Sequence, residues 1–241
     1  MSITAKTETT DPVWVVCRSV PDGFWEDPQN RMSYMQWLGK TLNYTKPDDW
    51  YKLTKRSFHE NHGLLLLCNY YDGSAIQALR EYKPELTKYE WLFQKISPRF
   101  WNKKKNRHRY IKWLGKKQNY KTMEDWYNLT SYIMRKNHGA TFLKTAYNGS
   151  VLLLLRDLFP QYNWQGWKLH FTPPSYWKVK ENRMEYMEWL FKQLGFNCAS
   201  DHHKLRQRDF LNNHGEWLII KHYKNSLQDA ISEYQFFKGI K

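Results

Sequence analysis

Apolar residues recur along the chain at helical spacing, in short segments separated by turn-forming residues. In the first segment Tyr34, Trp37 and Leu38 fall on one face of a helix. Asp27 before them suits an N-cap, and Pro28 suits the first helical position. The pattern therefore predicts a helix that begins at Pro28.

A second helix is predicted from 47–49, where a proline and two carboxylates match the positive end of a helix dipole. Trp50, Leu53 and Phe58 give this helix an apolar face. The apolar run at 64–71 predicts a third, short helix.

A fourth helix is predicted from residue 75, with Ser74 as its N-cap and Pro84 as its stop. The segment 91–97 that follows is predicted to be extended or to form a short strand, and it leads into the next Phe-Trp pair.

This set of segments occurs three times, with a constant offset of 76 residues and no gap. Such self-similarity is typical of repeat proteins. The following residues occupy equivalent positions in the three copies: Trp25, Trp101 and Trp177; Asn30, Asn106 and Asn182; Arg31, Arg107 and Arg183; Tyr34, Tyr110 and Tyr186; Trp37, Trp113 and Trp189; Asp49, Asp125 and Asp201; Tyr71, Tyr147 and Tyr223; Ser74, Ser150 and Ser226.

The predicted fold class is mainly α: three tandem helical repeats with helix-turn-helix-like cores, joined by extended Trp-containing segments. We predict a disordered tail over 1–12, a first repeat over 13–99, a second over 100–175 and a truncated third over 176–241. Segment 13–25 resembles the segment between repeats, so the first repeat carries an N-terminal half-linker. The Trp residues are expected to form the cores and the contacts between repeats.

An Asn-His-Gly triplet recurs at 61–63, 137–139 and 213–215, and it suggests either a metal site or a helix stop. His59 and His62 form an H-x-x-H pattern, but Arg and Leu replace His59 in the other copies. A metal or nuclease site is therefore disfavoured. We predict a helix stop in which the glycine takes the left-handed conformation.

No other pattern in the chain predicts catalysis. The nucleophile-elbow, zinc-protease and phosphate-loop motifs are missing from the sequence. The recurrent acids Asp49, Asp125 and Asp201 are explained by capping at a helix start. We predict no catalytic residue, no metal and no cofactor, and we do not expect an enzyme.

Composition adds a strong positive charge to this picture. The chain has 241 residues, 38 Lys and Arg against 23 Asp and Glu, and 17% aromatic residues. The aromatic content favours a folded protein, and the charge favours a polyanionic partner. The three cysteines form no C-x-x-C pair, and no apolar run is long enough for a membrane span. We expect a soluble intracellular protein without a membrane partner.

Most of the excess charge lies in the second copy, where residues 101–176 hold 14 Lys and Arg against 3 Asp and Glu. Such a run on a helix can neutralise phosphates and bind without reading sequence. The alternative is a solvated basic face. The candidate phosphate-binding residues of this segment are Lys103, Lys104, Lys105, Arg107, Arg109, Lys112, Lys116, Lys117 and Lys121.

Further candidates lie in and around the predicted helix-turn-helix segments. The fourth helix is too apolar for base recognition, so we expect weak specificity or readout of DNA shape. The recurrent arginines suit an A·T-rich minor groove, with an ion pair to a neighbouring acid as the alternative. These further candidates are Arg31, Arg183, Lys55, Arg56, Ser74, Arg80, Ser150 and Arg156.

The combined pattern FW, N-R, W-L-G-K, D-W-Y-x-L-T, N-H-G and G-S resembles repeats found in large double-stranded-DNA viruses of amoebae, notably the marseillevirus group. The resemblance covers 13–241. It implies a viral DNA-binding protein that acts in the host nucleus, the viral factory or the virion, and it supplies no catalytic residue. Copy three departs from the pattern at Phe191 and at His202 and His203, which puts contacts by that copy in doubt.

The sequence thus predicts a double-stranded-DNA-binding repeat protein with a modest preference for A·T-rich DNA and avidity from its tandem units. Host chromatin or nuclear proteins are further expected partners. A protein-interaction scaffold and an RNA-binding protein are the alternatives.

Overall fold

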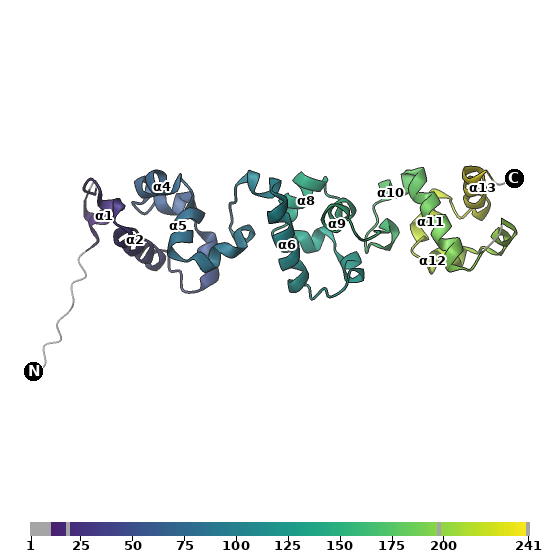
Figure 1. Ribbon diagram of the computed structural model, residues 1–241, viewed down its shortest axis with the longest axis horizontal. Coiled ribbons are helices and arrows are strands. Elements are labelled where there is room, and N and C mark those ends of the chain that lie inside the picture. The colour runs from purple at the N-terminus through teal and green to yellow at the C-terminus, as the bar shows by residue number, and fades with distance from the viewer. Residues whose placement is uncertain (1–10, 18–19, 197–198, 240–241) are drawn as a thin grey trace, which may run out of the picture. The chain divides into compact units, whose positions relative to one another are not determined.

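The computed structural model describes residues 11–17, 20–196 and 199–239. The predicted tail over 1–12 therefore lies outside the described residues, apart from its last two positions. The fold is mainly helical, as predicted, and the described residues contain no strand (Figure 1). The chain forms two compact units, Met1–Asn106 and Arg107–Lys241.

The first unit holds the first copy and the approach to the second. Its elements are α1 (Val13–Val16), η1 (Phe24–Glu26), α2 (Pro28–Thr41), η2 (Pro47–Lys52), α3 (Lys55–His59), α4 (Leu64–Tyr71), α5 (Ala75–Tyr82), η3 (Pro84–Leu92) and η4 (Pro98–Asn102).

The second unit begins within α6, close to its start, and holds most of the second copy and the whole third copy. Its elements are α6 (Lys104–Lys117), η5 (Glu124–Asn128), α7 (Ser131–Lys136), α8 (Ala140–Tyr147), α9 (Val151–Leu158), η6 (Gly166–Lys168), α10 (Pro174–Lys178), α11 (Lys180–Gln193), η7 (Ala199–Lys204), α12 (Gln207–Leu211), η8 (Leu218–His222) and α13 (Leu227–Lys238). The long helices α2, α6 and α11 begin 76 residues apart, at the spacing of the sequence repeat.

The predicted helix starts are confirmed where a side chain caps the backbone. Asp27 accepts a hydrogen bond from the backbone N–H of Gln29 at 2.8 Å, and α2 begins at Pro28. Ser74 accepts from the N–H of Gln77 at 3.4 Å, and α5 begins at the next residue. Local sequence therefore determines these starts.

Two predicted elements differ from the structure. The second helix is divided into η2 and α3, because Leu53 is extended and Thr54 caps a new helix at the N–H of Ser57. The segment predicted as extended over 91–97 is helical as far as Leu92, the end of η3. Only the residues after it leave the helix, and there the N–H of Gln94 donates to the carbonyl of Tyr51 at 3.1 Å.

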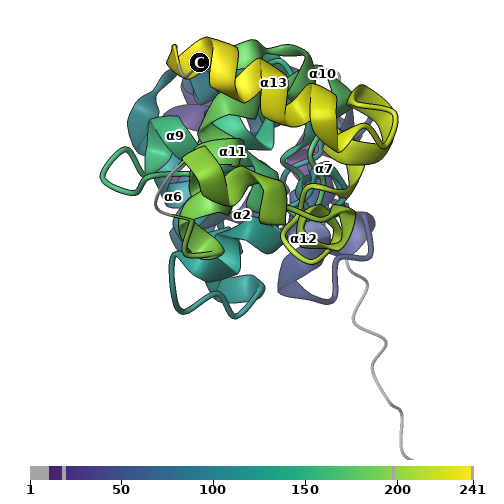
Figure 2. The ribbon, with the colours of Figure 1, turned by 90° about the vertical axis from the view of Figure 1, so that its right-hand side faces the viewer.

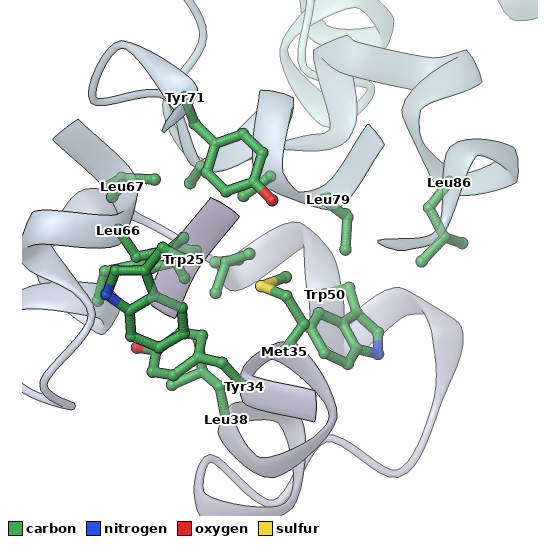
Figure 3. Packing of buried hydrophobic residues seen from close by; sticks show 14 of the residues in the cluster. Trp25, Tyr34, Met35, Leu38, Trp50, Leu66, Leu67, Tyr71, Leu79 and Leu86 are labelled. Carbon is green, nitrogen blue, oxygen red and sulfur yellow. The ribbon is translucent and has the colours of Figure 1, made fainter. Parts of the chain in front are cut away.

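Aromatic rings fill the core of the first unit, as predicted for the Trp residues. Trp25 and Tyr34 meet edge to face with ring centroids 5.6 Å apart, and Trp14 of the half-linker covers the same tyrosine at 5.6 Å. Figure 3 shows Trp50 on the opposite side of this cluster, towards Leu86. Trp14 and Trp25 thus complete the core of the first copy.

The second unit is held together by the segment between copies two and three. Trp167 packs on both Tyr186 and Trp189, with ring centroids 5.6 Å apart in each case. The core that contains Trp167 also reaches Leu152 of α9. Helices α10 and α13 pack against α11 in this unit (Figure 2). Copies two and three therefore share one compact unit.

The Asn-His-Gly triplet is a helix stop, as predicted, but the residue in the left-handed conformation differs from the prediction. The histidines, rather than the glycines, take the left-handed conformation: φ is 61° at His62, 63° at His138 and 62° at His214. The N–H of Gly63 donates to the carbonyl of Phe58 at 2.8 Å, the closing bond of a Schellman motif. Histidine tolerates this conformation better than most side chains.

The glycine of the triplet is required by a close approach. The hydroxyl of Tyr34 in α2 donates to the carbonyl of Asn61 at 2.8 Å, and a Cβ on Gly63 would overlap that hydroxyl. Tyr110 and Tyr186 make the same bond, at 3.0 Å, in copies two and three. The triplet therefore joins the first helix of each copy to the turn.

Copy three replaces one packed pair by another at the same two positions. In copies one and two a Cβ on Gly39 would lie 2.6 Å from the ring of Trp50, and one on Gly115 would lie 2.7 Å from that of Trp126. In copy three Phe191 stacks on His202, with ring centroids 4.5 Å apart. The two departures from the repeat pattern thus compensate each other inside the core.

We predict opposite effects from neighbouring substitutions in the triplet of copy two. Gly139→Ala should destabilise the protein by about 2–3 kcal/mol, because the new methyl group overlaps the hydroxyl of Tyr110. His138→Gly should stabilise it by up to about 1 kcal/mol, because it removes a left-handed non-glycine residue. Urea unfolding measures both. Equal losses at the two positions would contradict the assignment.

We also predict coupling between Gly115 and Trp126. Gly115→Ala should cost about 1–3 kcal/mol in the natural protein, since its Cβ meets the indole ring. In a Trp126→Phe background, whose ring is shorter, most of that cost should disappear. A double-mutant cycle by urea unfolding should give a coupling of about 1–2 kcal/mol. Additive losses would show that the two residues do not compete for space.

Candidate functional site

The recurrent arginines are engaged inside their copies. Arg31 donates from Nη1 to the carbonyls of Trp25 at 2.7 Å and Glu26 at 2.9 Å. Its Nε and Nη2 both bind the carboxylate of Glu81, at 3.1 and 3.0 Å. The hydroxyl of Tyr71 donates to the second oxygen of that carboxylate at 2.9 Å. One guanidinium therefore ties the start of α2 to α5.

The same network recurs in the other copies. Arg183 binds Glu233 and the carbonyl of Trp177 at 2.8 Å, and only 7% of the arginine is exposed. Arg107 pairs with Asp157 at 3.6 Å. The ion-pair alternative is therefore the one that the structure shows for these arginines, and a guanidinium held in this way is not placed to enter a minor groove.

The two candidate serines cap helices. Ser74 caps α5, and Ser150 accepts from the N–H of Leu153 at 3.2 Å at the start of α9. Both are half-buried. Capping of the helix is enough to explain why serine recurs at this position, and no DNA contact is needed.

The remaining candidates outside the second copy's first helix are scattered. Lys55 is exposed, Arg56 pairs with Glu60 at 2.6 Å, and Arg80 pairs with Glu90 at 3.6 Å. Arg156 is exposed near the end of α9. It lines a hollow together with two acids of the third copy, Glu185 and Glu188. These residues form no continuous basic surface.

The first helix of the second copy presents a basic face. Arg109, Lys112 and Lys116 recur on it at helical spacing, opposite the buried Tyr110 and Leu114. Both lysines are exposed and Arg109 is half-buried. The helix therefore has one side fixed in the core and one side lined with cations.

Two more lysines extend this surface at the C-terminal end of the helix. Lys117 lies over the ring of Trp113 at 5.0 Å from the centroid, and Lys121 is exposed in the following turn. We define the basic face as Arg109, Lys112, Lys116, Lys117 and Lys121. The other candidates of this segment, Lys103, Lys104 and Lys105, are exposed at the start of α6 and belong to the first unit.

The three acids of the second copy are bound within the fold. Asp125 accepts from the N–H groups of Lys121 and Thr122, both at 2.7 Å, and hydrogen bonds from these N–H groups lower the pKa of its carboxyl. Glu124 binds the hydroxyl of Tyr162, and Asp157 binds Tyr147 at 2.6 Å. These three are the only acids between residues 107 and 176.

The triplet histidine beside this face adds little charge. Burial, and after it the charge of Lys117, lowers the pKa of His138. The imidazole is therefore neutral near physiological pH, and the positive charge of the surface comes from lysine and arginine.

The same face has a different charge in each copy, a feature that no single copy reveals by itself. The positions equivalent to Arg109 and Lys112 are Ser33 and Gln36 in copy one, and Glu185 and Glu188 in copy three. Aligning the copies at their offset is the signal that reveals it. Cations at both of these positions therefore occur in copy two alone among the three.

The requirements of a metal site and of a membrane span can be compared with the part of the chain that the structure describes. No group of three or more His, Cys, Asp or Glu side chains there could hold a metal ion. None of its helices combines the length and apolar character that crossing a bilayer requires. Comparison of the chain with protein families, with curated protein sequences and with solved structures gave no match.

We predict that the arginine network makes stability depend on pH. Burial alone would raise the pKa of Glu233, but hydrogen bonds from Arg183 and Tyr223 outweigh it and hold that pKa below its usual value. The network then stabilises the fold above the unfolded pKa of about 4.5, and this contribution is lost as the pH falls through the lowered folded value. The urea midpoint of the natural protein should fall more steeply below about pH 5 than that of Glu233→Gln. Parallel curves would contradict this.

Proposed function

We propose that the chain binds double-stranded DNA through the basic face of α6. The observation that carries this proposal is the set of exposed lysines along one side of α6 and in the turn after it, Lys112, Lys116, Lys117 and Lys121. From Arg109 to Lys116 the basic face covers about 10 Å of helix axis at about 1.5 Å per residue. Cations at this spacing can meet successive phosphates of one strand.

Binding of this kind is driven by the release of counterions from the DNA. Each neutralised phosphate contributes about −0.9 to the slope of log affinity against log salt concentration. Affinity gained in this way carries little sequence information, since phosphates position a protein and base edges specify the site. The proposal is therefore phosphate binding, with any A·T or shape preference as a secondary effect.

Few of the candidate side chains can contact base edges, so we expect low sequence specificity. The recurrent arginines and the capping serines are bound within the fold. A modest preference for A·T-rich DNA would have to come from groove shape at the basic face. The resemblance to repeats of DNA viruses supports viral DNA or the host nucleus as the place of action, as part of the same proposal.

We predict that the basic face can be neutralised without harm to the fold by borrowing residues from copy one. The variant Arg109→Ser, Lys112→Gln, Lys117→Thr and Lys121→Thr carries the residues found at 33, 36, 41 and 45. Its affinity for duplex DNA should fall at least about tenfold, and its salt slope should become shallower by up to about 3.6. Fluorescence anisotropy on A·T-rich and G·C-rich duplexes across a salt series measures both.

A control variant with the same net charge separates the site from overall charge. Lys178, Lys192, Arg208 and Lys221 are exposed in copy three, and their replacement by Gln also removes four charges. This control should retain most of the affinity. Equal losses in the two variants would refute a localised site, stronger binding to duplex RNA would favour the RNA alternative, and a flat salt response would favour a protein scaffold.

A further inference from the structure

A hollow of about 560 Å³ lies on the first unit, between the end of α2, the turn before η2 and the end of α5. Gly39 and Trp50 line it together with residues of those turns. The volume is within the range of sites for small organic ligands and is much larger than a lone phosphate needs. The rings and charges that line the hollow indicate which class of ligand it could bind.

One side of the hollow is aromatic. The ring of Trp50 meets Tyr44 edge to face at a centroid distance of 5.2 Å, and it also packs on Tyr82 at 5.2 Å. Tyr44 and Tyr82 are half-buried, so part of each ring faces solvent. Figure 3 shows the indole of Trp50 at the margin of the core cluster. Such partly exposed rings suit a planar aromatic ligand.

The margin of the hollow is mainly positive. Lys40, Lys46 and Lys83 line it, against the single carboxylate of Glu85. Asp49, which follows on η2, is directed elsewhere: it binds Lys52 at 2.8 Å and the N–H of Lys46 at 2.9 Å. Three lysines around an aromatic site favour a ligand that carries a phosphate.

The hollow occupies the same place in copy one that the end of the basic face occupies in copy two. The positions equivalent to Gln36, Lys40 and Thr45 are Lys112, Lys116 and Lys121. The two surfaces are thus variants of one location in the repeat. Copy one has fewer cations on the helix there, but it has Tyr82 and Lys83 where copy two has Leu158 and Phe159. Phe159 packs on Trp126 at 5.0 Å as Tyr82 packs on Trp50, so copy one differs by a tyrosine hydroxyl and a lysine.

We propose that this hollow binds a nucleoside phosphate, with the base against the exposed parts of the Tyr44 and Tyr82 rings, next to Trp50, and the phosphate among the three lysines. Gln36, Thr45 and Glu85 offer hydrogen-bonding groups to the base edge or the sugar. The ligand is either a free nucleotide or an unpaired nucleotide of a nucleic acid. In the second case the inference rests on the proposed function.

The test compares adenosine monophosphate, adenosine and inorganic phosphate as probes of the full chain. Proton–nitrogen correlation NMR follows binding through the indole N–H signal of Trp50, assigned with Trp50→Phe. The monophosphate should shift this signal, and adenosine or phosphate alone should bind at least about tenfold more weakly. Equal binding of phosphate and monophosphate would overturn the proposal.

A pair of charge-matched variants keeps the test specific. Lys40→Gln, Lys46→Thr and Lys83→Gln together should weaken monophosphate binding about tenfold. Lys55→Gln, Lys95→Gln and Arg99→Gln remove three exposed charges elsewhere in the unit and should leave binding unchanged. Equal losses would mean that overall charge, and not the hollow, attracts the anion.

Duplexes with and without an unpaired adenosine overhang distinguish the two ligand sources. If the overhang strengthens binding and the lysine variant removes that gain, the nucleotide belongs to nucleic acid. If the monophosphate binds but neither duplex does, the hollow takes a free nucleotide and the proposed function fails alone. If blunt duplex binds but neither the overhang nor the monophosphate has an effect, the proposed function stands and the hollow proposal is wrong.

Discussion

The hydrogen bond from the tyrosine of each first helix to the asparagine carbonyl of the triplet is the contact on which each copy depends. It brings Tyr34, Tyr110 and Tyr186 against the turn so closely that only glycine fits beside the hydroxyl. The asparagine amide also ends the preceding helix, since in copy one it donates to the carbonyl of Ser57 at 2.7 Å. The histidine then has to supply the left-handed turn. One buried contact thus determines all three residues of a motif that resembles a metal site.

Local signals in the sequence predicted much of the fold, and the parts that failed depend on distant partners. Caps such as Asp27 and Ser74 act within three residues of themselves, so their helices were predictable. The role of Gly63 depends on Tyr34, which lies 29 residues earlier in the chain and gives no local sign. The division of the second helix required knowing that Leu53 is buried in an extended conformation.

The sequence predicted where the cations of the candidate site lie. It did not predict which of them form ion pairs within the fold. Composition located the cations of copy two, and helical spacing placed them on one side of α6. Whether a cation is available depends on acids far along the chain: Arg31 pairs with a carboxylate 50 residues away. A recurrent arginine in a basic protein was therefore as compatible with an ion pair as with DNA binding, and only the packed structure separates the two.

The copies share a scaffold and differ on one face, which changes how tandem repeats would act on a polyanion. Avidity from equal units needs the same contact in each. Here the equivalent positions are Ser33 and Gln36 in copy one and Glu185 and Glu188 in copy three, so a duplex bound at copy two as proposed would meet acids at the third copy's equivalent face. Like charge there disfavours the backbone of DNA. The copies therefore share one scaffold, in which the Gly–Trp pair is replaced by Phe–His inside copy three, and they differ in the charge of this outer face.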